Sequence, residues 1–262
     1  MAITNGPHPD HREDLVRGLK VSTRTAGPAP AVDGSKTEPT PMVFVSGLAM
    51  SNRYLVPCLR ELGRERYVLA PDLPGVGGST GAGHRMTMAE LADWLKDYLD
   101  TIGVPRAVVA GHSLGVQVVV ELAARHPGSV EAAVLVSPAR DPNCRELWRV
   151  AWQLLRDGFR ERPTLIGIAV TDYLRTGTVR MLGTLREARR SNALLAARRM
   201  PQPTLVVRGS RDPLVRELWA QRLTRAMPSA SLVTIPGAPH AVVYSAADDF
   251  VAEVRHFLGA IA

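Results

Sequence analysis

The sequence predicts an α/β protein whose mostly parallel sheet is covered by helices on both faces. Two observations indicate this class. Short apolar runs rich in β-branched residues alternate with longer segments in which apolar residues recur at helical spacing. This alternation is regular to residue 137, stops between 138 and 200, and returns from 201 onward. A chain of 262 residues, 45% of them hydrophobic, can form one domain with a sizeable core.

Strands are predicted where apolar and polar residues alternate, or where short apolar runs lie between turn residues. The polar residues 1–14 are expected to form a loose tail, and the glycine- and proline-rich residues 27–41 a loop. The predicted strands are 19–25, 42–45, 67–70, 107–110, 130–136, 204–207 and 231–235.

Helices are predicted from apolar residues at helical spacing. The clearest begins at Thr87-Met-Ala-Glu90, a capping box followed by one continuous apolar face. The other predicted helices are 54–62, 116–124, 145–159, 164–174, 179–200, 217–227 and a closing helix over 250–261.

Residues 138–200 contain three of these helices and no convincing strand. We interpret them as a helical cap, or lid, inserted into a core made of 1–137 and 201–262. The alternative is that they are ordinary helices packed on the sheet.

Composition excludes several classes of protein. The formal net charge of +7 is almost entirely arginine and is scattered, which favours a solvated basic face over nucleic-acid binding. No apolar run is long enough to span a membrane, and the N-terminal residues do not resemble a signal peptide, so we expect a cytoplasmic protein without membrane insertion. Cys58 and Cys144 are expected to be reduced thiols.

Gly111-His-Ser113-Leu-Gly115 lies between the predicted strand 107–110 and the predicted helix 116–124. A serine on such a sharp turn has an exposed hydroxyl, and the small residues two places away on either side allow strand and helix to approach closely. The backbone N–H of Leu114 and the positive end of the helix would face a developing oxyanion. The motif alone is a weak signal, because it arises by chance in about one in ten chains of this length.

A serine nucleophile needs a base and an orienting acid. The carboxyl ends of parallel strands are where open sheets place their sites, and Ser113, Asp212 and His240 each follow such a strand. A neutral imidazole would take the serine proton, and a carboxylate would fix its tautomer and stabilise its cation.

These residues and four further segments resemble the α/β-hydrolase-fold serine hydrolases over about residues 41–137 and 201–262. The segments are Ser46-Gly47-Leu48, Asp72 to Ser79, Gly209 to Asp212 and Gly237 to His240. The resemblance implies an α/β-hydrolase fold with Ser113 as nucleophile, His240 as general base and then acid, and Asp212 as orienting carboxylate. It also implies an oxyanion hole formed by the backbone N–H groups of Leu48 and Leu114. Members of the family usually have His-Gly where this chain has Ser46-Gly47.

Several assignments stay open beside this one. Asp141 could supply the acid instead of Asp212. His112 adjoins the nucleophile but should point away from it, and His84 could line the mouth of the site. Arg53 could hold a substrate carboxylate, although a surface role is favoured. Gly75 to Gly78 lacks phosphate-loop spacing and is interpreted as a structural turn.

The aromatic residues of the predicted cap could line an acyl pocket or only anchor the cap. They are Trp148, Trp152, Phe159 and Tyr173.

The predicted function is hydrolysis of a small, largely apolar ester or related acyl bond through an acyl-serine intermediate. The alternatives are a C–C bond hydrolase, a cofactor-free haloperoxidase or perhydrolase of the same fold, and a triad-containing ligand sensor. No cofactor or metal is implied, because the sequence lacks a ligand spacing such as H-E-x-x-H. The expected partner is a small-molecule acyl substrate, and the expected oligomeric state is monomer or homodimer.

Overall fold

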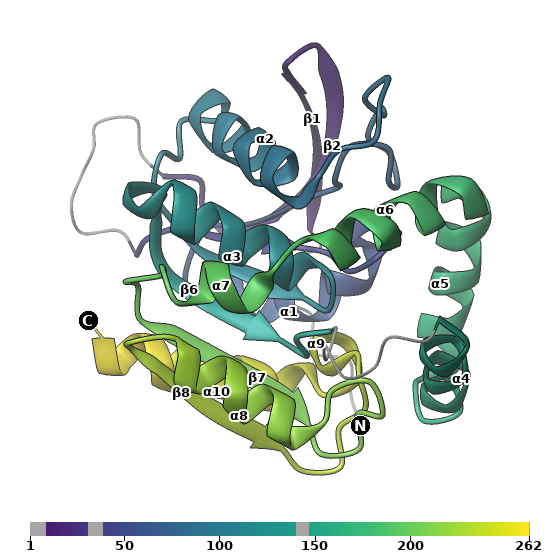
Figure 1. The fold of residues 1–262 in the computed structure, drawn as a ribbon. Coiled ribbons are helices and arrows are strands. Elements are labelled where there is room, and N and C mark those ends of the chain that lie inside the picture. The colour runs from purple at the N-terminus through teal and green to yellow at the C-terminus, as the bar shows by residue number, and fades with distance from the viewer. Residues whose placement is uncertain (1–8, 31–38, 140–146, 262) are drawn as a thin grey trace.

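A computed structural model describes residues 9–30, 39–139 and 147–261, with the side chains of the fourth helix described from residue 152. Its centre is an eight-stranded sheet of order β1-β2-β4-β3-β5-β6-β7-β8 (Figure 1). The strands are β1 (Asp10–Val16), β2 (Leu19–Ala26), β3 (Met42–Val45), β4 (Val68–Pro71), β5 (Ala107–His112), β6 (Val130–Val136), β7 (Thr204–Gly209) and β8 (Ala230–Ile235). From β4 to β8 all neighbours are parallel, while β1 and β2 pair antiparallel at one edge. This confirms the predicted fold class.

The prediction of a loose tail was wrong for residues 10–14. They belong to β1, which pairs with β2 from Asp10 opposite Thr25 to Val16 opposite Leu19. Arg17 and Gly18 both have positive φ and form the tight turn of this hairpin. The strand is polar because it lies at the sheet edge, where a charged, largely exposed strand needs no apolar pattern.

Helices cover both faces of the sheet, so that two apolar layers enclose it. The first layer contains α2 (Met88–Thr101), α3 (Gly115–Arg125) and α8 (Glu217–Ala226), and the second contains α1 (Val56–Leu62), α9 (Val242–Ser245) and α10 (Ala247–Ile261). The capping box predicted for α2 is present in both directions between Thr87 and Glu90. β5, at the centre of the sheet, is buried along its whole length and carries the nucleophile motif at its end.

Between β6 and β7 the chain forms α4 (Leu147–Gly158), α5 (Pro163–Thr176), α6 (Thr178–Arg190) and α7 (Ala193–Ala197). α4, α5 and α6 stand out to one side of the sheet, while α7 packs back against α3 and α8 (Figure 1). The single helix predicted for 179–200 is therefore two helices. They separate at Ser191-Asn192, because the Asn192 side chain accepts a hydrogen bond from the N–H of Leu195 and caps a new helix.

Candidate active site

Ser113 lies on a strained turn between β5 and α3. Its φ of 55° is unusual for a residue with a side chain, and its N–H donates to the carbonyl of Val136 at 2.8 Å. Glycine is required nearby, since a Cβ on Gly115 would lie 2.5 Å from the carbonyl oxygen of Val45. A Cβ on Gly111 would likewise lie 2.8 Å from the backbone of Gly115. The close packing of strand and helix thus presents the serine hydroxyl at the end of the sheet.

The structure brings Ser113, His240 and Asp212 together. The His240 Nε2 lies 2.9 Å from the Ser113 Oγ, and its Nδ1 lies 2.8 Å from Asp212 Oδ2. The other oxygen of Asp212 accepts hydrogen bonds from the N–H groups of Leu214 and Val215, at 2.8 and 3.1 Å. His240 and Asp212 are buried, and Ser113 is partly open to the adjoining pocket.

The electrostatics of this pair favour an ionised carboxylate. Burial would raise the pKa of Asp212, but the charge of His240 and the hydrogen bonds to Asp212 lower it below its ordinary value. Burial lowers the pKa of His240, whereas nearby carboxylates, above all Asp212, raise it from 6.5 to about 9. The site therefore stabilises positive charge on the imidazole, which is what proton transfer from the serine creates.

The backbone N–H groups of Leu48 and Leu114 have no hydrogen-bond acceptor within the described residues. Both residues line the pocket that contains Ser113. The turn that carries Leu48 is held by Tyr54, whose hydroxyl accepts from the N–H of Gly47 at 2.9 Å. Ser46 is buried, and its hydroxyl has no partner in the described part of the chain, so it does not replace a polar contact of the usual histidine.

His112 points away from Ser113, as the sequence predicted. Its Nδ1 lies 3.0 Å from the hydroxyl of Tyr54, and its Nε2 lies 3.1 Å from the carbonyl of His240. Burial lowers the pKa of His112 to about 3, so the ring is neutral. A neutral ring with its proton on Nε2 accepts from Tyr54 and donates to His240. His112 thus connects the Leu48 turn to the His240 loop.

Two carboxylates that the sequence reasoning missed also fix the His240 loop. Asp157, in α4, accepts from the N–H of His240 at 3.1 Å, and Glu161 accepts from the N–H of Ala241 at 2.7 Å. Burial raises the pKa of Asp157 to about 7. A signal was available in the sequence, because Asp157 follows Leu154 at helical spacing and so interrupts the apolar stripe of its helix with a charge.

Arg53 is not a free cation for substrate. It forms an ion pair with Asp172 of α5, and its Nε lies 3.2 Å from the Ser51 hydroxyl. The buried Asp172 also accepts from the N–H and hydroxyl of Ser51, at 2.8 and 2.7 Å. Arg53, one third exposed (33%), is thus a partly exposed arginine with a structural ion pair, and this pairing argues against a substrate contact. The interaction ties α5 to the segment that follows Leu48.

A pocket of about 620 Å³ opens in front of Ser113 and His240. We call it the apolar pocket, because most of its wall consists of hydrophobic side chains from α4, α5 and the strand ends. Phe159 and Tyr173 line it, whereas Trp152 is 62% exposed and does not. Its lining is Gly47, Leu48, Met50, Tyr54, His112, Ser113, Leu114, Ala139, Leu154, Leu155, Asp157, Gly158, Phe159, Glu161, Leu165, Ile166, Ala169, Val170, Tyr173, Leu185, Leu214, His240 and Ala241.

The remaining candidates have other positions. The Gly75–Gly78 turn encloses the buried carboxylate of Asp72, which accepts from the N–H of Gly78 at 2.9 Å, so the turn is structural. His84 lines a second, neighbouring pocket. Cys58 is a buried free thiol. Asp141, Cys144 and the side chain of Trp148 lie outside the described residues.

Across 9–30, 39–139 and 147–261, no cluster of His, Cys, Asp and Glu could hold a metal ion, and no helix is long and apolar enough to cross a membrane.

The fold and the Ser113 turn together are those of a hydrolase of the α/β class. The model of the alpha/beta hydrolase family matches residues 42–254, and the chain belongs to this family. A putative non-heme haloperoxidase of Mycobacterium phage D29 is 31% identical over 231 residues, covering 77% of this chain and 78% of that protein. The putative carbamate hydrolase RutD of Yersinia enterocolitica is 28% identical over 236 residues, covering 80% and 84%.

Solved structures agree on the fold. The enol-lactonase from Burkholderia xenovorans superposes with a TM-score of 0.76 at 21% identity, covering 95% of this chain and all of that one (100%). At this level of identity the similarity establishes the fold alone. With its named hydrolase relatives, the family match makes this protein an enzyme of the hydrolase type.

Proposed function

We propose that the protein is a serine hydrolase that cleaves a small, largely apolar ester or related acyl bond. The observation that carries this proposal is the hydrogen-bonded chain from Ser113 through His240 to Asp212 at the floor of the apolar pocket. A pocket with hydrophobic walls and a few converging polar groups suits an apolar acyl compound.

In the proposed reaction His240 takes the proton of Ser113 as the serine oxygen attacks the substrate carbonyl. The negative charge that develops on the carbonyl oxygen is stabilised by the N–H groups of Leu48 and Leu114, which have no other acceptor in the described residues. When the intermediate collapses, His240 gives its proton to the leaving alkoxide, and an acyl-serine remains. A water molecule, deprotonated by the same histidine, then releases the acid and regenerates Ser113.

We further propose that residues 138–200 act as a cap over a core of 1–137 and 201–262. Helices α4 and α5 and the turn between them supply much of the apolar wall, including Leu154, Phe159 and Ile166. The same segment, from α4 to α5, binds the core through Asp157, Glu161 and Asp172. The cap would therefore define the substrate that the core residues cleave.

A second candidate function is a perhydrolase-type haloperoxidase, favoured by the similarity to the phage protein of that name. Here hydrogen peroxide in place of water would attack the acyl-serine, releasing a peracid that oxidises halide. Halogenation that requires both hydrogen peroxide and a carboxylic acid, and that is lost in Ser113→Ala, would distinguish it from simple ester hydrolysis.

The test uses p-nitrophenyl esters of increasing acyl length. We expect Ser113→Ala and His240→Ala each to lower kcat by about three orders of magnitude or more, with the double variant little worse, because the residues act as a unit. Thermal unfolding of each variant checks that the fold is retained. Additive losses would count against the assignment.

Equal, trivial rates in wild type and Ser113→Ala would overturn the esterase proposal and favour C–C hydrolysis or ligand sensing. A sensor would be recognised by ligand-induced thermal stabilisation without product, persisting in Ser113→Ala.

A further inference from the structure

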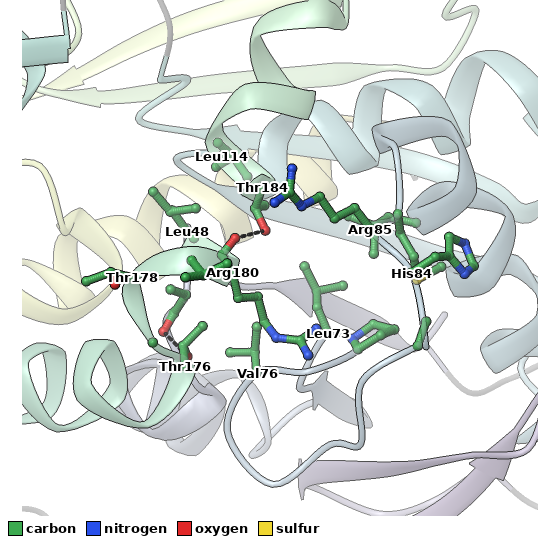
Figure 2. Close-up of a pocket in the computed structure, with 18 of the residues that line it drawn as sticks. Leu48, Leu73, Val76, His84, Arg85, Leu114, Thr176, Thr178, Arg180 and Thr184 are labelled. Atoms are coloured by element: carbon green, nitrogen blue, oxygen red, sulfur yellow. Dashed lines mark hydrogen bonds between the residues drawn. The ribbon is translucent and has the colours of Figure 1, made fainter. Parts of the chain in front are cut away.

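A second pocket, of about 580 Å³, adjoins the apolar pocket. The two share Gly47, Leu48 and Leu114, so they meet at the N–H groups that face the Ser113 site. The second pocket lies between the loop of residues 73–86 and the beginning of α6 (Figure 2). We call it the arginine pocket.

The described lining of the arginine pocket is basic and contains no carboxylate. Its charged groups are Arg85, from the core loop, and Arg180, from α6, beside His84. Neither arginine side chain has a hydrogen bond or an ion pair within the described residues. The Nε2 of His84 lies 3.5 Å from a carboxylate oxygen of Glu90, which does not line the pocket. Some arginines of the chain, such as Arg53 with Asp172, are paired instead.

Three glycines leave room for the two arginine side chains. A Cβ on Gly75 would lie 2.2 Å from Nη1 of Arg180, and one on Gly81 would lie 2.6 Å from its Nη2. A Cβ on Gly183 would lie 3.0 Å from Nε of Arg85. Each guanidinium therefore lies against the backbone of the opposite wall, and Figure 2 shows the side chains extending in opposite directions. Both walls thus contribute one cation to the lining of the same pocket.

The pocket also contains neutral donors. Thr176, Thr178 and Thr184 line it, but the hydroxyls of Thr176 and Thr184 already donate to the carbonyls of Ala49 and Arg180. The donor that remains for a ligand is the hydroxyl of Thr178, at the beginning of α6, where the positive end of the helix dipole also lies. Guanidinium groups bind carboxylates and phosphates through parallel N–H···O hydrogen bonds, and like charges from two walls favour an anion between them.

We propose that the arginine pocket binds an anionic group, a carboxylate or a phosphate, of the same substrate whose carbonyl is attacked by Ser113. This inference rests on the proposed function. The carbonyl oxygen of such a substrate would lie at the N–H groups of Leu48 and Leu114, where the two pockets meet. Its apolar part would then lie in the apolar pocket and its anionic part in the arginine pocket. The substrate class is therefore an amphiphilic acyl compound with one anionic end.

The experiment compares matched anionic and neutral esters. In one arm the anion is on the acyl side, as in p-nitrophenyl hemiesters of dicarboxylic acids against their methyl esters. In the other it is on the alcohol side, as in butyryl 4-hydroxybenzoate against its methyl ester. The readout is the ratio of kcat/KM for the anionic over the neutral ester. We expect wild type to prefer the anionic ester in one arm by about tenfold, and less at high salt.

Arg85→Gln and Arg180→Gln should each lower this ratio by about threefold to fivefold, the range of an accessible ion pair. Arg186→Gln is the matched control, because Arg186 is an exposed arginine of α6 that does not line the pocket. It should leave the ratio unchanged.

The outcomes separate this inference from the proposed function. Serine-dependent hydrolysis of neutral esters without an anionic preference in either arm would overturn the inference alone. Absence of any serine-dependent hydrolysis would overturn the proposed function, and inorganic phosphate then tests the pocket directly. Thermal stabilisation of Ser113→Ala by phosphate, lost when Arg85 and Arg180 are replaced, would support the pocket, and its absence would overturn it.

Discussion

The strand ends and the α4–α6 helices form the same pocket, but they are packed very differently. β5 is fully buried, and the turn after it depends on backbone contacts too close for any side chain. In α4–α6 large apolar side chains are exposed, Phe159 by 86% and Leu174 by 78%. The Ser113 turn is therefore fixed by tight core packing, whereas the shape of the pocket depends on a more loosely packed wall.

The two regions are joined largely by carboxylates. Leu165 is buried in the core, but the carboxylates of Asp157 in α4, Glu161 between α4 and α5, and Asp172 in α5 accept hydrogen bonds from core backbone N–H groups. Buried carboxylates hold such contacts strongly only when ionised. Because burial raises the pKa of Asp157 to about 7, its contact with the N–H of His240 should weaken as the pH falls through that value.

A pair of glycine substitutions tests the packing difference most strongly. Gly115→Ala should lower the free energy of unfolding by about 1–3 kcal/mol and reduce activity, because its Cβ meets the backbone of Val45 and Ser46. Gly167→Ala, in the middle of α5, has open space and should instead raise stability by about 0.5–1 kcal/mol. Thermal or urea unfolding measures both. Similar losses in the two variants would show that the helices are packed as tightly as the core.

This difference also explains what the sequence could predict. The core strands and Ser113, Asp212 and His240 are marked by local patterns, because each follows a short buried run and a turn. Asp172 is not, since a carboxylate inside an amphipathic helix has the same local sequence whether it faces solvent or a core N–H. Asp157 interrupts an apolar stripe, but that local signal does not show which group the carboxylate contacts. The β1 strand was missed for a related reason, because its stability comes from pairing with β2 and not from an apolar pattern.

Asp157→Asn probes the link between the two regions through pH. The pKa of His240 is raised from 6.5 to about 9, and only the neutral imidazole can accept the Ser113 proton. Activity should therefore rise with pH, and the midpoint of this rising limb of the pH profile should lie above 6.5. The negative charge of Asp157 contributes to this raised pKa, so its removal should move the limb to lower pH.

Asparagine keeps an oxygen that can accept from the N–H of His240, so the loop retains its hydrogen bond. The pH profile of kcat/KM is the measurement. Glu65→Gln, at an exposed ion pair with Arg255, is the control and should leave the limb where it is. A limb that stays fixed or moves upward in Asp157→Asn would show that this carboxylate does not act on His240.

The smallest expected effect concerns the pocket wall itself. Phe159 lines the apolar pocket although most of its ring is exposed, while Trp152 is exposed and lies outside the lining. Phe159→Ala should lower kcat/KM for the longest p-nitrophenyl ester by about threefold and leave the acetate ester nearly unchanged, because only a long acyl chain reaches that ring. Trp152→Ala removes a larger apolar side chain and should leave the chain-length profile intact. If both variants shift the profile equally, the chain-length preference comes from the general stability of the helices and not from contact with the substrate.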